Sequence, residues 1–107
     1  MITYEEFKKL DLKVAEIKEV IEHPQADKLY VIKVDTGNET KQIVAGIRLK
    51  YQKEDLIGRK IILLNNLEPV IIRGIESQGM LLAASDDENL SILTLDRTII
   101  KNGAIVK

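Results

Sequence analysis

The side chains best suited to binding chemistry lie within residues 61–84. Two apolar runs, 61–64 and 81–84, flank an interrupted polar connection, and this pattern favours two buried strands joined by an irregular loop over one helix. The connection presents four polar side chains, Asn66, Arg73, Ser77 and Gln78. A guanidinium can hold a phosphate with two parallel hydrogen bonds, while hydroxyl and amide groups suit ribose and base edges. Because packed strands fix the loop in place, we expect a binding region here.

Each candidate also has a structural interpretation, which the sequence leaves open. Arg73 could form a surface ion pair with Glu68 or Glu76 instead of meeting a ligand. Ser77 could be a turn residue whose hydroxyl bonds nearby backbone, and Asn66 could hold the loop in the same way. The neighbouring Met80 could offer a soft, polarizable surface to a ligand or could simply fill the core.

No enzyme constellation is present in the sequence. It contains no nucleophile elbow, phosphate-binding glycine loop, dinucleotide fingerprint or metal-ligand spacing. The acidic run 86–89 lacks the spacing of a calcium loop and is typical of an exposed turn. We therefore expect a non-catalytic protein with no cofactor and no metal.

Length and composition predict one small domain, residues 1–107. The absence of cysteine excludes disulfides and thiolate metal sites, and His23 is the only histidine. No apolar run approaches the roughly 20 residues of a membrane span, and the N-terminal residues do not resemble a signal peptide. These features predict a cytoplasmic protein that does not enter a membrane.

Charge is segregated along the chain although the net charge is only −1. Residues 41–60 contain six basic and two acidic side chains, a local charge of +4, whereas residues 61–107 carry −2. A basic patch would suit a nucleic acid, but mixed charges on a solvated surface explain the sequence equally well. Lys28 and Lys33 each lie close in sequence to an aspartate that could neutralise them, Asp27 and Asp35.

The N-terminal third contains one ambiguous element. Thr3 and Glu6 form a capping box that predicts a helix from about Tyr4. Apolar residues at alternating spacings of three and four would extend this helix to Glu22, yet the β-branched residues of 12–22 favour a strand. Pro24 then ends the element.

The remaining pattern predicts short strands with one helical turn. Strands are expected at 29–34, 40–47, 60–64 and 90–95, with turns at 35–38 and 86–89, a helical turn within 50–58 that Gly58 closes, and a turn at 102–103 inside 98–106. This order predicts an all-β fold: a five-stranded OB-fold barrel with a short N-terminal helix, a small helix between strands 3 and 4, and extra C-terminal strands.

Two ordered motifs add a resemblance that extends over nearly the whole chain. Pro-x-Ala-Asp-Lys-Leu occupies 24–29, and Arg-Gly-(x2)-Ser-x-Gly-Met-x-Leu-Ala occupies 73–83. Both are similar to the tRNA-binding domain family, OB-fold modules found at the C-terminus of many methionyl-tRNA synthetases and as free-standing tRNA-binding proteins. The resemblance implies a short helix followed by a long first strand, so 12–22 is predicted as a strand.

The resemblance also implies a set of RNA-binding residues. Ser77 and Met80 match family positions tied to RNA contact, and basic residues on the predicted 29–34 and 40–47 hairpin match its binding face. Lys13 stands where many members have Arg, and Ile71 stands where members often have a polar residue, which removes one charge. The predicted set is Lys13, Lys33, Lys41, Asn66, Arg73, Ser77 and Met80.

Three functions follow as hypotheses from this resemblance. The first is a structure-dependent, sequence-nonspecific tRNA-binding module that forms a homodimer and works as a domain or partner subunit of a methionyl-tRNA synthetase. The second is a peptide-binding module, because an export-related chaperone shares the Ser-x-Gly-Met motif. The third is a domain that mainly dimerises a synthetase.

Overall fold

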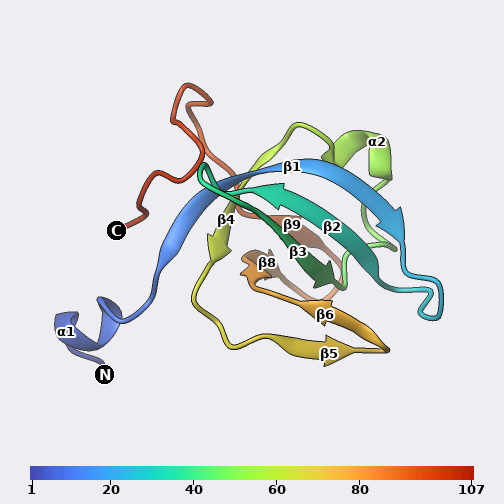
Figure 1. Ribbon diagram of the computed structural model, residues 1–107, viewed down its shortest axis with the longest axis horizontal. Coiled ribbons are helices and arrows are strands. Elements are labelled where there is room, and N and C mark those ends of the chain that lie inside the picture. Colours follow the sequence, from blue (N-terminus) through green and yellow to red (C-terminus); the bar gives the residue numbers. More distant parts are fainter.

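The computed structural model describes residues 1–107 and has a short helix at its N-terminus. Helix α1 (Tyr4–Phe7) begins where the capping box predicts, since the Thr3 hydroxyl accepts a hydrogen bond from the Glu6 amide and the Glu6 carboxylate accepts one from the Thr3 amide. None of its residues is buried, and Figure 1 shows it standing apart from the barrel.

The ambiguous segment is a strand, as the resemblance implies. β1 (Leu12–Glu22) pairs with β4 (Lys60–Leu64) through its first half and with β2 (Tyr30–Asp35) through its second half. A register shift between Ile17 and Glu19 inserts one extra residue. The core-facing residues are therefore spaced by two and then by three, at Ala15, Ile17 and Val20. Of Val14, Ile17 and Ile21, which have helical spacing in the sequence, only Ile17 joins the core cluster, so that spacing does not mark one face of the strand.

Five antiparallel strands form a nearly closed barrel. β3 (Thr40–Ala45) and β7 (Met80–Leu81) complete the sheet in the order β3-β2-β1-β4-β7, of which Figure 1 labels the first four strands. The β2–β3 hairpin and the predicted helical turn, α2 (Lys53–Leu56), are both present. Leu56 of α2 is fully buried and joins the core, which is dominated by aliphatic residues from the inner faces of the strands. The predicted fold class is confirmed.

The connection between β4 and β7 is more regular than the sequence suggested. Its centre is a two-stranded hairpin of β5 (Val70–Ile72) and β6 (Ile75–Ser77), so the prediction of an irregular loop is wrong. Arg73 and Gly74 form the two-residue turn with φ values of 51° and 87°. Positive φ at both positions is the mark of a type I′ turn, which normally has Asn or Gly first. Arg73 concealed that signal.

Side chains join this hairpin to the edge of β3. The Gln42 and Gln78 pair exchanges two bonds of 2.8 Å, from the Gln78 amide to the Gln42 carbonyl and from the Gln42 amide to the Gln78 side-chain oxygen. The Val44 amide donates to the Ser77 hydroxyl at 3.0 Å. Two of these three hydrogen bonds, those accepted by Gln78 and Ser77, use a side-chain oxygen where a neighbouring strand would offer a backbone carbonyl. Residues 77 and 78 therefore close the barrel edge without a continuous ladder of backbone hydrogen bonds.

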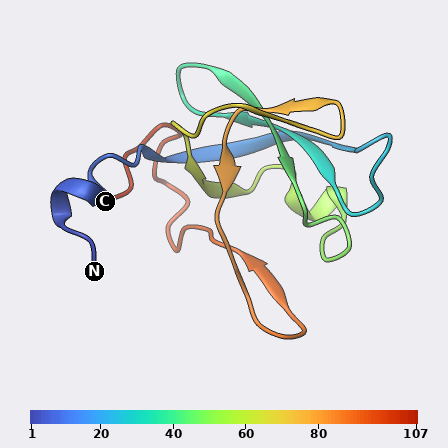
Figure 2. The same ribbon diagram turned by 90° about the horizontal axis from the view of Figure 1, so that it is seen from below.

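The C-terminal third adds a hairpin and a segment along β1, residues 102–106, which we call the strap. β8 (Ala83–Ser85) and β9 (Leu90–Ile92) project from the barrel as a hairpin around the predicted 86–89 turn (Figure 2). β9 stops at Ile92, short of the predicted 90–95 strand. Residues 102–106 then run along β1, where the Val14 amide donates to the Ala104 carbonyl at 2.9 Å. The two chain ends lie on one side of the molecule (Figure 1).

The strap is fixed to β1 by Asn102 as well. Its amide nitrogen donates to a Glu16 carboxylate oxygen at 3.1 Å. This bond, followed by that from Lys18, holds the pKa of Glu16 below its ordinary value.

No helix of the protein is long and apolar enough to span a bilayer.

Candidate nucleic-acid interface

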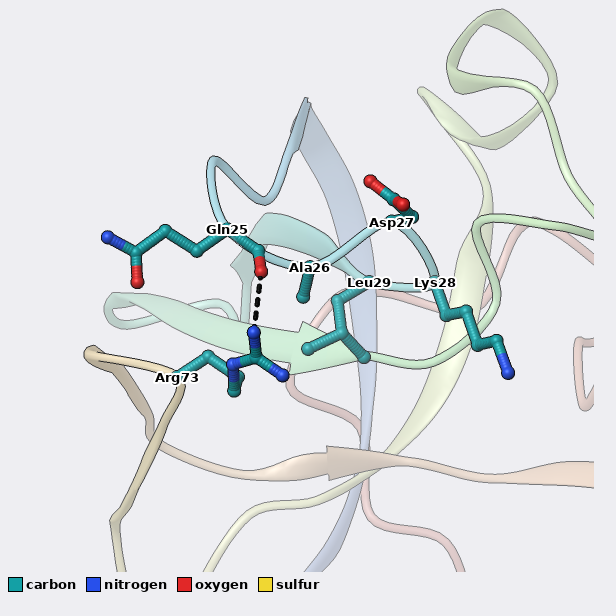
Figure 3. Close-up of a pocket in the computed structure, with 6 residues that line it drawn as sticks. All are labelled: Gln25, Ala26, Asp27, Lys28, Leu29 and Arg73. Atoms are coloured by element: carbon teal, nitrogen blue, oxygen red, sulfur yellow. Dashed lines mark hydrogen bonds between the residues drawn. The ribbon is translucent and has the colours of Figure 1, made fainter.

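A cleft lies between the β1–β2 loop and the Arg73–Gly74 turn. Its volume is about 520 Å³, and it is lined by Gln25, Ala26, Asp27, Lys28, Leu29 and Arg73 (Figure 3). In an OB fold, the loops at this end of the barrel, between strands 1 and 2 and between strands 4 and 5, commonly hold oligonucleotides. The cleft occupies that location, because β7 is the fifth barrel strand.

Two hydrogen bonds fix the walls of the cleft to each other. His23 is buried, and its Nδ1 accepts a bond of 3.0 Å from the Gln25 amide. Nδ1 therefore carries no proton, so Nε2 is the donor to the Ile72 carbonyl 3.1 Å away. The Arg73 guanidinium donates from Nη2 to the Gln25 carbonyl at 2.9 Å (Figure 3). The hairpin is thereby attached to the β1–β2 loop.

Arg48 supports the outer wall of the cleft. Its Nη1 donates to the Ala26 carbonyl at 3.1 Å, while Nη2 lies 2.7 Å from a Glu22 carboxylate oxygen. Lys53 of α2 lies 3.5 Å from the other oxygen of the same carboxylate. This cluster ties the loop to the end of β1 and to α2. The loop is thus held in shape before any ligand arrives.

Arg73 is positioned as a ligand-binding cation would be. It is exposed and forms no ion pair with Glu68 or Glu76, which removes the salt-bridge interpretation. Beyond the bond to Gln25, its guanidinium makes no hydrogen bond within the chain. It is also the only non-glycine residue with positive φ. Such strain, about 1 kcal/mol or more, is commonly kept where a side chain has a function.

Lys28 and Lys33, which lie close in sequence to Asp27 and Asp35, form no ion pair. Lys28 is exposed at the cleft and Lys33 is half-buried on β2, and neither forms a salt bridge. Asp35 instead accepts a bond from the Gly37 amide at 2.8 Å. The cleft therefore adds Lys28 to Arg73 as a second cation outside any ion pair, with the Asp27 carboxylate also lining the cleft.

Three residues of the predicted set gather away from the cleft, where β1 begins and β4 ends. Lys41 donates to the Asn65 carbonyl at 2.8 Å, and Lys13 lies 3.8 Å from an Asp11 carboxylate oxygen. Asn66 accepts from the Asp11 amide at 3.0 Å and donates to the Lys9 carbonyl at 2.8 Å. Asn66 therefore holds the loop, in agreement with its structural interpretation. RNA contact by these three residues stays a prediction.

Ser77 lies in the barrel wall. The residue is only 3% exposed. Its hydroxyl donates to the Gly79 carbonyl at 3.1 Å and accepts a hydrogen bond from the Val44 amide. Both bonds are to backbone, so the structure favours the backbone interpretation over the predicted donation to RNA. The reason is the β3 edge, which needs a partner for the Val44 amide.

We expect Ser77→Ala to destabilise the fold and to leave binding unchanged. Removing the hydroxyl leaves the Val44 amide without a hydrogen-bond acceptor, so the free energy of unfolding should fall by about 1–3 kcal/mol. Urea denaturation measures this loss, with Ser91→Ala on the exposed face of β9 as a control. An RNA affinity that drops in folded Ser77→Ala, with stability unchanged, would restore the hydroxyl to the binding site.

Met80 is on the surface and does not fill the core. The residue is 45% exposed and borders an apolar hollow with Val44, Gly46 and Ile47. Ile71 of the hairpin is also exposed. The core interpretation of Met80 is therefore wrong.

The structure divides the predicted set among five places. Arg73 stands at the cleft, Met80 borders the apolar hollow, and Lys13, Lys41 and Asn66 meet at the β1–β4 junction, whereas Lys33 lies on β2 and Ser77 in the barrel wall. Residues 25, 26, 28 and 29 were missed as a site, although they belong to the 24–29 motif. A motif of polar and small residues between two predicted strands was the available signal.

Comparison with known proteins gives the same family. Residues 12–104 match the family model described as "Putative tRNA binding domain". The methionine–tRNA ligase of Thermococcus onnurineus is 53% identical over 106 residues, and that of Nanoarchaeum equitans is 48% identical over 99 residues. These matches cover 99% and 92% of this chain, but only 14% and 13% of the ligases. The chain thus spans about one seventh of the length of these relatives.

Solved structures agree over the full chain. A protein from Pyrococcus horikoshii, described as related to methionyl-tRNA synthetase, has a TM-score of 0.93 and 33% identity, covering 100% of this chain and 98% of its own. The CsaA chaperone protein of Picrophilus torridus has a TM-score of 0.92 and 34% identity, covering 100% of both chains. The family match and the shared barrel together establish that this chain belongs to the tRNA-binding domain family.

Proposed function

We propose that this protein is a non-catalytic module that binds tRNA through its shape and backbone rather than its sequence. The observation behind the proposal is the cleft, whose walls are tied together and whose two cations, Arg73 and Lys28, form no ion pair although Asp27 also lines it. Phosphate contacts fix the position of an RNA without reading bases. Exposed Met80 and the half-buried Lys33 extend the surface beyond the cleft.

The partner follows from the relatives. The ligases that this chain resembles join methionine to tRNA, and the structural relative from Pyrococcus horikoshii is described as related to the same enzyme. The module would supply tRNA affinity to a methionyl-tRNA synthetase, either within one chain or as a separate subunit, in the cytoplasm.

The proposal includes a homodimer. Apolar side chains are exposed on both terminal segments: Ile2, Tyr4, Leu10, Ile99 and Ile105. The two chain ends lie on one side of the molecule (Figure 1), and exposed apolar side chains are suited to an interface. Light scattering after size exclusion should give the mass of two chains at micromolar concentration. The mass of one chain would reject the dimer and leave tRNA binding untouched.

Charge removal at the cleft tests the function. Arg73→Asn keeps a residue that tolerates positive φ, and Lys28→Gln keeps most of the side-chain length. Each should weaken binding of unfractionated tRNA by about tenfold, since a charge-assisted bond contributes roughly 1.5–3 kcal/mol. Arg97→Gln and Lys101→Gln are matched controls, because both residues are exposed and distant in sequence from the cleft. Equal affinity in all four variants would reject the assignment.

A second candidate is binding of unfolded peptide. Val70 and Ile71 of the hairpin and Met80 are exposed apolar residues, and two structural relatives, from Bacillus anthracis and Picrophilus torridus, are described as chaperones. A permanently unfolded polypeptide tested beside tRNA separates the two functions. Strong binding of the polypeptide with no binding of tRNA would favour this candidate.

A further inference from the structure

The cleft has a floor that duplex RNA would not need. Ala26 and Leu29 point toward Arg73 from the β1–β2 loop, while Lys28 extends from the far end of the same loop (Figure 3). Phosphates of a duplex lie on its outer surface and are met by protruding cations. A recessed apolar floor beside two cations suits a base that has left its stack, because such a base offers a flat face to the floor and its phosphate a negative charge to the cations.

Gly46 lies between a residue of the cleft and the hollow beside Met80. A Cβ built on Gly46 would lie 3.7 Å from a methyl of Leu29, which lines the cleft. Gly46 also lines the apolar hollow together with Val44 and Met80. The hollow has a volume of about 300 Å³, at the lower end of the range of small-molecule sites. The lack of a side chain at the exposed Gly46 leaves space for a passage between the two.

We propose that the cleft and the hollow together bind an unpaired, unstacked segment of RNA that crosses Gly46. One base would lie on Ala26 and Leu29 beneath the Arg73 guanidinium, with its phosphate near Lys28. The RNA strand would then pass over Gly46, and its next base would lie against the thioether of Met80. The inference rests on the proposed function and names the class of RNA structure that this site takes.

Gly46 permits a steric test with little risk to the fold. Its φ lies outside the positive range, and Leu29 is the single neighbour within 4 Å of an added Cβ, at ordinary contact distance. Gly46→Ala and Gly46→Val should therefore fold, with thermal unfolding as the check. Ala84→Val adds comparable bulk on the exposed β8–β9 hairpin and serves as the control.

The experiment compares a six-nucleotide single-stranded RNA with a blunt-ended RNA duplex by fluorescence anisotropy. We expect the wild type to prefer the single strand, Gly46→Val to weaken that binding by about tenfold, and Gly46→Ala to have a smaller effect. Ala84→Val should match the wild type, and duplex binding should not respond to Gly46.

Each other outcome has a distinct meaning. If the wild type binds unfractionated tRNA but Gly46→Val leaves both tRNA and single-strand affinities unchanged, the inference is overturned while the proposed function stands. If no RNA binds the wild type, the proposed function fails with it. Loss of unfolded-polypeptide binding in Gly46→Val, with RNA affinity intact, would assign the passage to a peptide.

Discussion

Replacing Gly103 with alanine is expected to lower the free energy of unfolding by about 3 kcal/mol, because strain and overlap act together. Gly103 has a φ of +90°, and an added Cβ would lie 2.5 Å from the Thr36 carbonyl oxygen. Gly37 meets the same contact from the other side, with a Cβ position 2.6 Å from the Asn102 carbonyl. The C-terminal strap and the β2–β3 turn are thus too close for any side chain.

Gly58→Ala is the matched control for this loss. Gly58 has a φ of +89°, almost the same as Gly103, but nothing lies within 4 Å of an added Cβ. It should therefore report strain alone, about 1 kcal/mol. Urea denaturation measures both variants, and hydrogen exchange at the Val14 amide reports release of the strap. An equal loss of unfolding free energy in the two variants would mean that the strap can shift away from the β2–β3 turn without destabilising the fold. The close approach of these two segments would then not contribute to stability.

Salt is expected to weaken tRNA binding by about four powers of ten for a tenfold rise in concentration, if five or six phosphates are contacted. Each neutralised phosphate releases counterions and contributes roughly 0.7–0.9 to the slope of log affinity against log salt. The net charge of −1 would suggest no such dependence, but the cleft holds two cations, Lys28 and Arg73, against one carboxylate, that of Asp27, and neither cation is in an ion pair. Local charge, and not the sum over the chain, governs the contact.

The same titration identifies the contributing residues. Arg73→Asn should reduce the slope by about one, whereas Lys101→Gln should leave it unchanged. A slope near zero in the wild type would contradict phosphate recognition altogether. A normal slope that does not respond to Arg73→Asn would move the phosphate contacts away from the cleft.

Local features of the fold were readable from the sequence because neighbouring residues create them. The capping box of α1, the turn at 86–89 and the closure of α2 by Gly58 each depend on residues within a few positions. The strand β1 was not readable in this way, because apolar residues on both of its faces, such as Val14 and Ile17, imitate helical spacing. There the family resemblance, and not periodicity, gave the right answer.

The β5–β6 hairpin escaped prediction for a different reason. Its type I′ turn begins with Arg73, a residue that this turn disfavours. A local rule broken in this way commonly marks function. The sequence placed Arg73 in a loop correctly, yet the strained turn that aims it at the cleft was visible only in the structure.

The sequence by itself determined the family, the barrel and which side chains were able to bind a phosphate. Tertiary structure decided which of them are free to do so, because their partners lie far away in the chain. Lys41 is engaged by the Asn65 carbonyl and Ser77 by the Val44 amide. Arg73 instead contacts a single carbonyl, that of Gln25, 48 residues away, and keeps its remaining donors for a ligand. Burial and hydrogen bonding depend on such distant contacts, so no local pattern could have assigned them.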